Sequence, residues 1–97
     1  MRIISVKRLR EFWEKHSDSE QALRAWYEET KKSNWNNPND IKQMYSSASI
    51  LANNKAVFNI RGNTYRLVVA INYAYKIVFI RFIGTHKEYD RIKVAEV

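Results

Sequence analysis

The chain has 97 residues, no cysteine and a formal net charge of +7 at neutral pH. This length fits a single domain, residues 1–97, with one modest core, and it excludes a deep, closed substrate cavity. Without cysteine, the chain has no disulfide framework, no thiolate zinc site and no cysteine nucleophile.

The N-terminal segment lacks the long apolar core and the small-residue cleavage site of a signal peptide. No apolar run approaches the roughly 20 residues that are needed to span a bilayer. The default expectation is therefore a soluble cytoplasmic protein without a membrane partner.

The N-terminal half is expected to be helical after a brief edge strand at residues 2–5. Two apolar stripes recur at helical spacing, the first at Val6, Leu9 and Trp13 and the second at Ala22, Leu23, Trp26, Tyr27 and Thr30. Between them, Ser17 to Glu20 has the Ser-x-x-Glu form of a capping box, which would end the first helix and open the second.

The middle of the chain contains the clearest loop, residues 34–40, because Asn and Pro favour turns. Asn39 or Asp40 can cap a short helix that continues through Tyr45. Four stretches rich in β-forming residues follow, with a tight hairpin turn at Arg61–Asn63 after the second: 48–51, 55–60, 64–71 and 76–84.

A second capping box, Thr85 to Glu88, predicts a short C-terminal helix. The order of elements predicts an α+β fold, with two N-terminal helices packed on one face of a mainly antiparallel sheet of about four strands. Alternation along the strands turns Asn59 and Arg66 away from the core, with Arg61 expected beside them. That face is expected to be open and rimmed by His86 and Tyr89.

Charge is spread unevenly along the chain. Residues 1–40 carry eight Lys or Arg and seven Asp or Glu, whereas residues 41–97 carry nine and three. No acidic residue occurs from Ile41 to Lys87. An acid-free basic surface attracts phosphates because binding releases counterions, so the sheet is expected to contact RNA or DNA. A basic surface that serves only solubility is the alternative.

Two segments resemble HigB-type toxins of the RelE superfamily, which belong to bacterial type II toxin–antitoxin modules. The first is Lys55–Ala70, with the pattern Asn-Ile-x-Gly-Asn-x-Tyr-Arg-Leu, and the second is Phe79–Asp90, with Gly-Thr-His-x-x-Tyr-Asp. The helical N-terminal half and the Asn/Pro loop also fit in position. The resemblance therefore extends over essentially the whole chain and implies a small RelE-like fold.

The resemblance implies an endoribonuclease that cuts mRNA, typically in the ribosomal A site, and a cognate helix-turn-helix antitoxin that neutralises it. It also implies cleavage without a metal or other cofactor: the ribose 2′-OH attacks the adjacent phosphorus and leaves a 2′,3′-cyclic phosphate and a 5′-OH. The expected partners are mRNA, the ribosome with its RNA, and a HigA-like antitoxin in a hetero-oligomer.

The family pattern assigns roles to particular residues of this chain. Arg66 matches the arginine that contacts the scissile phosphate, and His86 matches the histidine that several members use for proton transfer. Tyr89 and Asp90 lie where relatives place an aromatic or acidic group against the substrate. The resemblance thus implies Arg66, His86 and Tyr89 as catalytic residues, and Asp90 as a contact to RNA.

The chain departs from RelE itself on the strand from Val57 to Asn59, where RelE has lysines. A lysine general base is therefore not indicated, and Asn59 is expected only to contact RNA. Lys55, Arg61 and Lys87 are expected to contact the RNA backbone rather than to carry out chemistry.

Each candidate also has a structural explanation. Arg66 suits a phosphate because its planar fork donates two hydrogen bonds at once, but a strand arginine can instead lie in an ion pair. Histidine ordinarily changes charge near neutral pH, but His86 could be a surface residue beside a cap. Tyr89 could stack on a base or donate a proton, or pack against the sheet. His16 is expected only to end the first helix, and two distant histidines make no metal site.

Two other functions remain open from the sequence. A non-catalytic RNA-binding module would use the same basic sheet, but His86 would be dispensable. A purely structural partner protein would use its charge to bind an acidic segment of an antitoxin-like protein.

Overall fold

The computed structural model describes all residues, 1–97. The elements, with η marking short 3₁₀ turns, are in chain order β1 (Arg2–Ile4), α1 (Val6–Lys15), η1 (Ser17–Ser19), α2 (Glu20–Lys31), α3 (Pro38–Met44), β2 (Ser49–Leu51), β3 (Lys55–Ile60), β4 (Tyr65–Asn72), β5 (Ile77–Thr85), α4 (His86–Arg91) and η2 (Val94–Glu96). No helix is both long and apolar enough to cross a membrane.

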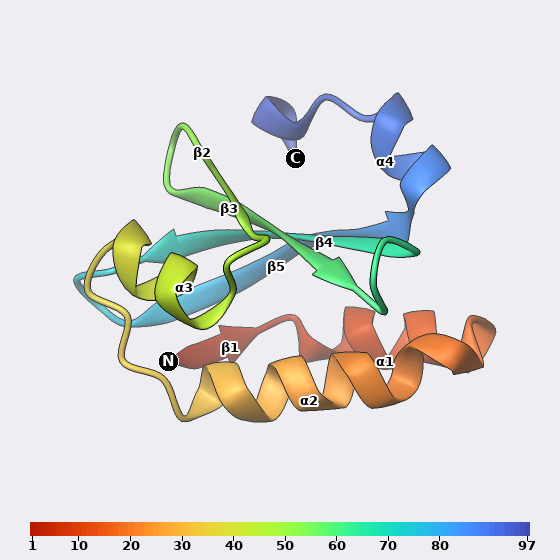
Figure 1. Cartoon of the computed structure of the whole chain (residues 1–97), viewed down its shortest axis with the longest axis horizontal. Helices are drawn as coiled ribbons and strands as arrows, with labels where there is room; N and C mark the ends of the chain where they lie inside the picture. Colours follow the sequence, from red (N-terminus) through yellow and green to blue (C-terminus); the bar gives the residue numbers. More distant parts are fainter.

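One sheet organises the molecule, with strand order β1-β5-β4-β3-β2. β2 to β5 form an antiparallel meander, whereas β1 runs parallel to β5 over only three residue pairs. α1 and α2 lie along one face of the sheet, and α4 and η2 lie over the other (Figure 1). The predicted α+β class and mainly antiparallel sheet are confirmed. The sheet has five strands rather than about four.

The core lies between the sheet and the α1–α2 pair. Tyr65, Leu67, Val69 and Ile71 of β4 are all buried, as the alternation predicts. Phe58 of β3 is enclosed by aromatic rings, with Trp26 at 5.4 Å and Trp35 at 6.1 Å between ring centroids. Trp35, in the Asn-rich loop, is therefore a core residue, and each such buried side chain stabilises the fold by about 1.5–3 kcal/mol.

A β-bulge in β5 decides which way Arg81 points. Val69 pairs with Ile80, but its neighbour Val68 pairs with Phe82, so Arg81 is an extra residue opposite no partner. The side chain of Arg81 is exposed as a result. Bulges re-aim side chains in this way because the residue count on the two strands no longer matches. Simple alternation left this arginine ambiguous.

The second face of the sheet is not open along its whole length, which corrects the sequence-based expectation. Val57 is 4% and Val68 is 0% exposed. The C-terminal segment, with α4 and η2, lies over this face of the sheet (Figure 1). The ammonium of Lys55 holds that segment by donating to the carbonyls of Val94 and Ala95, at 3.0 and 2.9 Å. At the end of this face near the β3–β4 hairpin, Asn59 and Arg66 stay partly exposed.

Two predicted caps are wrong. Residues Ser17–Ser19 form a 3₁₀ turn without a capping box, and the Ser19 hydroxyl donates to the His16 carbonyl at 2.7 Å. The short α3 is capped by Asn37, earlier in the chain than expected, because its side chain accepts from Asp40 N at 3.1 Å. Pro38 then fits at the first helical position, where no N–H is needed.

Candidate active site

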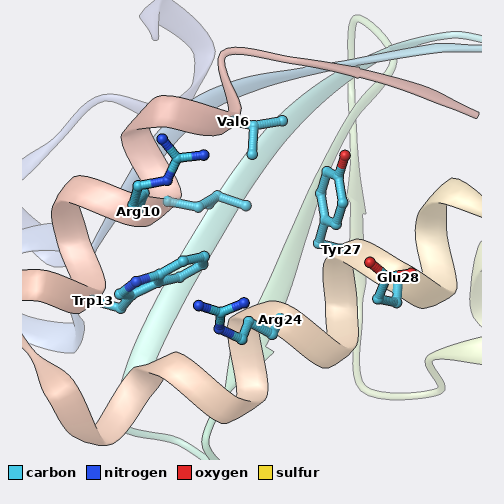
Figure 2. Close-up of a pocket in the computed structure, with 7 residues that line it drawn as sticks. Val6, Arg10, Trp13, Arg24, Tyr27 and Glu28 are labelled. Atoms are coloured by element: carbon cyan, nitrogen blue, oxygen red, sulfur yellow. The ribbon is translucent and has the colours of Figure 1, made fainter.

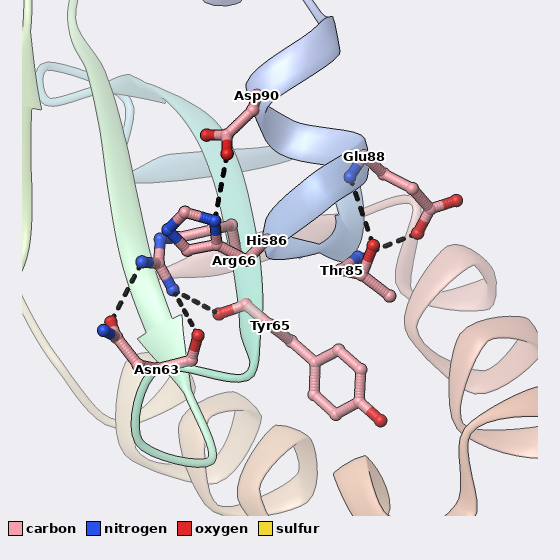
Figure 3. A network of polar contacts seen from close by, with 7 residues as sticks. All are labelled: Asn63, Tyr65, Arg66, Thr85, His86, Glu88 and Asp90. Atoms are coloured by element: carbon pink, nitrogen blue, oxygen red, sulfur yellow. Dashed lines mark hydrogen bonds and ion pairs between the residues drawn. The ribbon is translucent and has the colours of Figure 1, made fainter.

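The strand register brings three of the predicted site residues to one corner of the molecule. Arg66 of β4 pairs with Asn59 of β3 on one side and with Gly84 of β5 on the other. His86 follows Gly84 by two residues, and its backbone N–H donates to the Thr64 carbonyl at 3.2 Å. Arg66 and His86 therefore lie at the same end of the central hairpin (Figure 3).

The guanidinium of Arg66 is held by neutral oxygens. Nη1 donates to the carbonyls of Asn63 and Tyr65 at 3.1 and 3.3 Å, and Nη2 donates to Asn63 Oδ1 at 2.9 Å. None of the ion pairs in the structure involves Arg66. The structural explanation of Arg66 as a strand arginine in an ion pair is therefore excluded. The positive charge stays uncompensated by any protein carboxylate.

The same contacts leave part of the Arg66 fork free. A guanidinium has five N–H donors. Three are used on Asn63 and Tyr65, which leaves Nε–H and one Nη2–H without a protein acceptor. These two donors form the side-on fork with which an arginine makes a bidentate contact to a phosphate. The hairpin turn thus orients Arg66 and leaves this fork available.

The imidazole of His86 is oriented by Asp90 on the next turn of α4. His86 Nδ1 and Asp90 Oδ2 are 3.1 Å apart, and the two side chains are 51% and 58% exposed. With Nδ1 engaged by the carboxylate, Nε2 is the nitrogen that can exchange a proton with a bound molecule. In this structure Asp90 therefore orients the imidazole of His86, as the dashed line between them in Figure 3 shows.

The predicted capping box at the start of α4 is confirmed. Thr85 Oγ1 accepts from Glu88 N at 3.1 Å, and Glu88 Oε1 accepts from Thr85 N at 2.8 Å. The hydrogen bond from the Thr85 backbone lowers the pKa of the Glu88 carboxyl below its usual value, against a smaller opposing effect of burial. Because His86 is the first residue of α4, this box fixes the backbone from which the imidazole projects.

Gly84 is required by a close approach rather than by backbone strain. A Cβ at this position would lie 2.5 Å from Phe82 Cζ and 3.1 Å from Glu88 Oε1. Tyr89 packs on the same Phe82 ring, at 6.5 Å between centroids. Tyr89 is half-buried, which matches the packing explanation.

The expected RNA contacts Lys55, Arg61 and Lys87 do not cluster. Lys55 is engaged with the C-terminal carbonyls. Arg61 has a left-handed φ of 53°, which turns it away from Arg66, and it pairs with Asp18 at 3.3 Å on the helical side. The hydrogen bond from the Tyr65 hydroxyl to Asp18, at 2.5 Å, raises the pKa of Tyr65. Lys87 is exposed on α4.

The corner with Arg66 and His86 is an open surface, because neither residue lines any of the three clefts of the molecule. One of these clefts, of about 370 Å³, lies between α1 and α2 (Figure 2). Its wall includes Trp13, with the Arg24 guanidinium 4.8 Å from the ring centroid. No group of three His, Asp or Glu side chains is placed to hold a metal ion.

Sequence reasoning overlooked Asn63, which orients Arg66. Its only signal was the Gly-Asn pair of a hairpin turn, which indicates backbone conformation and not a side-chain contact. It also overlooked a cleft lined by Arg8, Lys15 and Arg81, because its residues come from α1, β5 and α4, which are far apart in the sequence.

Comparison with known proteins places this chain in a family. Residues 19–92 match the model of the HigB toxin family, described as the RelE-like toxic component of a toxin–antitoxin system. The chain is also 27% identical over 94 residues to mRNA interferase HigB from Escherichia coli O6:H1, strain CFT073, which covers 95% of this chain and 91% of that protein. The chain therefore belongs to the HigB family of RelE-like toxins, whose partner in a toxin–antitoxin system is an antitoxin.

Proposed function

We propose that this chain is an endoribonuclease that cuts mRNA on the ribosome, at the corner formed by Arg66 and His86. The observation that carries the proposal is the free side-on fork of Arg66 beside a histidine whose Nδ1 is engaged by Asp90. The similar Escherichia coli protein is named an mRNA interferase, which supports mRNA as the substrate.

In the proposed reaction, a ribose 2′-oxygen forms a bond to the adjacent phosphorus and the bond from phosphorus to the 5′-oxygen breaks. One proton leaves the 2′-OH and one proton reaches the 5′-oxygen. The products are a 2′,3′-cyclic phosphate and a 5′-OH. His86 Nε2 carries one of these two protons, and Tyr89 or Asp90 assists the other transfer.

Arg66 supplies the charge that the reaction requires. Negative charge develops on the equatorial oxygens of the phosphorane, and a preoriented guanidinium stabilises that charge. In many nucleases a metal ion has this role, and here Arg66 takes it, so the proposed reaction is independent of metal. Asn59, directly opposite Arg66, and the exposed Lys87 are the proposed neighbouring contacts to RNA.

Arg61 and Lys55 remain proposed RNA contacts, at a greater distance from the reaction. Their present partners are Asp18 and the C-terminal carbonyls, so a phosphate would have to compete for or share each cation. The proposed neutralising partner is a helix-turn-helix antitoxin of the HigA type, and the proposed site of action is the cytoplasm, where ribosomes are found.

The test uses a defined mRNA on purified ribosomes and an identical RNA with a single 2′-deoxy nucleotide at the cleaved position. We expect cleavage of the first RNA and none of the second, with fragments ending in a 2′,3′-cyclic phosphate and beginning with a 5′-OH. Cleavage of free RNA, where it occurs, should persist in EDTA. Binding of both RNAs without cleavage of either would support the non-catalytic RNA-binding module instead.

A further inference from the structure

A cleft lined by three cations opens along the edge of β5. β1 pairs with β5 only as far as Phe79, after which the chain turns into α1. The cleft beyond this point has a volume of about 370 Å³ and lies between α1, residues 81–83 of β5 and Glu88 of α4. It is separate from the Arg66–His86 corner, since neither of those residues lines it.

Three cations line this cleft without a carboxylate partner. Arg8 and Lys15 lie seven residues apart on α1 and thus on one side of the helix. Arg81 is exposed at the β-bulge, with its guanidinium 5.4 Å from the centroid of the Phe79 ring. None of them takes part in an ion pair of the structure. Arg8 Nη1 donates to the Arg81 carbonyl at 2.6 Å, which fixes the arginine against the strand.

The cleft also holds carboxylates and flat rings. Glu11 and Glu88 line it, but Glu88 is committed to the capping box of α4. The rings of Phe12 and His16 are stacked, at 4.3 Å between centroids and 22° between planes, and both line the cleft. Cations beside flat rings are the combination that binds single-stranded nucleic acid, because phosphates contact the cations and bases stack on the rings.

We propose that this cleft binds the backbone of the RNA strand outside the bond that is cleaved, with Arg8, Lys15 and Arg81 contacting phosphates. The proposal rests on the proposed function, because the same strand must reach Arg66 and His86. α4 separates the two places, with Glu88 toward the cleft and the exposed Lys87 following directly after His86. An RNA strand would therefore pass around the start of α4.

The experiment measures binding of a non-cleavable 2′-O-methyl RNA of roughly 12 nucleotides, a length within the range of single-strand sites. Lys15→Gln and Arg81→Gln each remove one cation from the cleft. Lys7→Gln is the matched control, because Lys7 is exposed on the same helix and lies outside the cleft. Arg8 is left unchanged because it holds the Arg81 carbonyl.

We expect both cleft substitutions to weaken binding several-fold at every sequence tested, since phosphate contacts carry no sequence information. The slope of log K against log salt should become shallower by about 0.7 for each phosphate that the variant no longer neutralises, whereas Lys7→Gln leaves it unchanged. A trinucleotide that spans only the Arg66–His86 corner should bind all variants equally.

Wild-type binding by Lys15→Gln and Arg81→Gln, or an equal loss in Lys7→Gln, would overturn the cleft as an RNA subsite. If RNA is still cleaved in that case, the proposed function stands and only the cleft assignment fails. If the substitutions weaken binding but wild-type protein cleaves no RNA, the cleft assignment stands and the catalytic proposal fails. A loss confined to ribosome binding, with free RNA unaffected, would also overturn the assignment to the substrate strand.

Discussion

The two faces of the sheet are covered in different ways. On one face, the two long helices α1 and α2 bury Leu67 and Val69 of β4 completely. On the other face, over which the short C-terminal segment lies, Val68 is fully buried but the nearby Arg66 is partly exposed. Successive residues of one strand thus serve opposite purposes, because side chains alternate between faces.

Neighbouring residues of β4 therefore contribute to different properties: those on the helical face to stability, and Arg66 on the other face to the proposed reaction. The helical face supplies most of the buried apolar surface, whereas the other face leaves a charged corner against the hairpin turn. A small domain has too little core to place a reactive site at its centre, so a partly covered sheet face is where such a site can lie. Substitutions on the two faces should therefore change different measured quantities.

The largest effect is expected from Leu67→Ala on the helical face. Removal of a fully buried leucine leaves a cavity in a close-packed core, which should reduce the free energy of unfolding by about 2–5 kcal/mol. Urea unfolding followed by circular dichroism measures this loss. A change below about 1 kcal/mol would show that the core can collapse around the site, and the proposed division between the faces would be weakened.

Arg66→Ala, one residue earlier in β4, should slow cleavage strongly but change the free energy of unfolding little. Loss of the charge interaction with the phosphorane should slow cleavage roughly 10²–10³-fold, or about 3–4 kcal/mol in the activation free energy. Unfolding should change little, because the hydrogen bonds that Arg66 makes are to a turn at the surface. Arg66→Lys keeps the charge but not the planar fork, and it should recover only part of the rate. A large drop in melting temperature would instead mark Arg66 as structural.

His86→Gln should slow cleavage by roughly 10²-fold, since the variant keeps a similar shape but cannot carry a proton. RNA and ribosome binding should remain at wild-type strength. Lys7→Gln is the control, because Lys7 is exposed on α1 and lies outside both the Arg66–His86 corner and the cleft beside β5. Full activity in His86→Gln would move proton transfer to Tyr89 or Asp90.

Local patterns in the sequence correctly predicted much of this arrangement. The strand Lys55–Ile60 has the bounds expected from its composition, and the Thr85 capping box forms because both of its partners lie within one helical turn. Alternation also placed Arg66 opposite the core. These features depend on residues a few positions apart, where spacing alone determines which side chains meet.

The features that the sequence did not predict depend on longer-range geometry or on single backbone angles. Lys55 donates to backbone carbonyls 39 and 40 residues away. Every residue has a backbone carbonyl, so the sequence does not indicate which ones a lysine will contact. Arg61 does not lie beside Arg66, because its left-handed φ directs its side chain toward Asp18. The bulge at Arg81 adds a residue to one strand, which no alternation pattern reveals in advance.

The smallest expected effect is on pH-dependent stability and concerns Glu88, at the junction between the two faces. Its pKa is lowered in the folded protein from an ordinary value of 4.5, chiefly by the hydrogen bond from the Thr85 backbone. The ionised carboxylate therefore stabilises the fold above that ordinary value, and this contribution is lost as the pH falls through the lowered pKa. Glu88→Gln should cost about 0.3–1 kcal/mol at neutral pH, as expected for an exposed acid at a helix start.

Denaturant unfolding of the wild-type and Glu88→Gln proteins at neutral pH and at roughly pH 3 measures this difference. The gap between the two should narrow on acidification, because the wild-type carboxyl then becomes neutral like the glutamine. Cleavage by the variant at neutral pH should fall only slightly, since Thr85 still accepts from the backbone of residue 88 and α4 still presents His86. A gap that stays constant with pH would mean that Glu88 acts through packing beside Gly84 rather than through its charge.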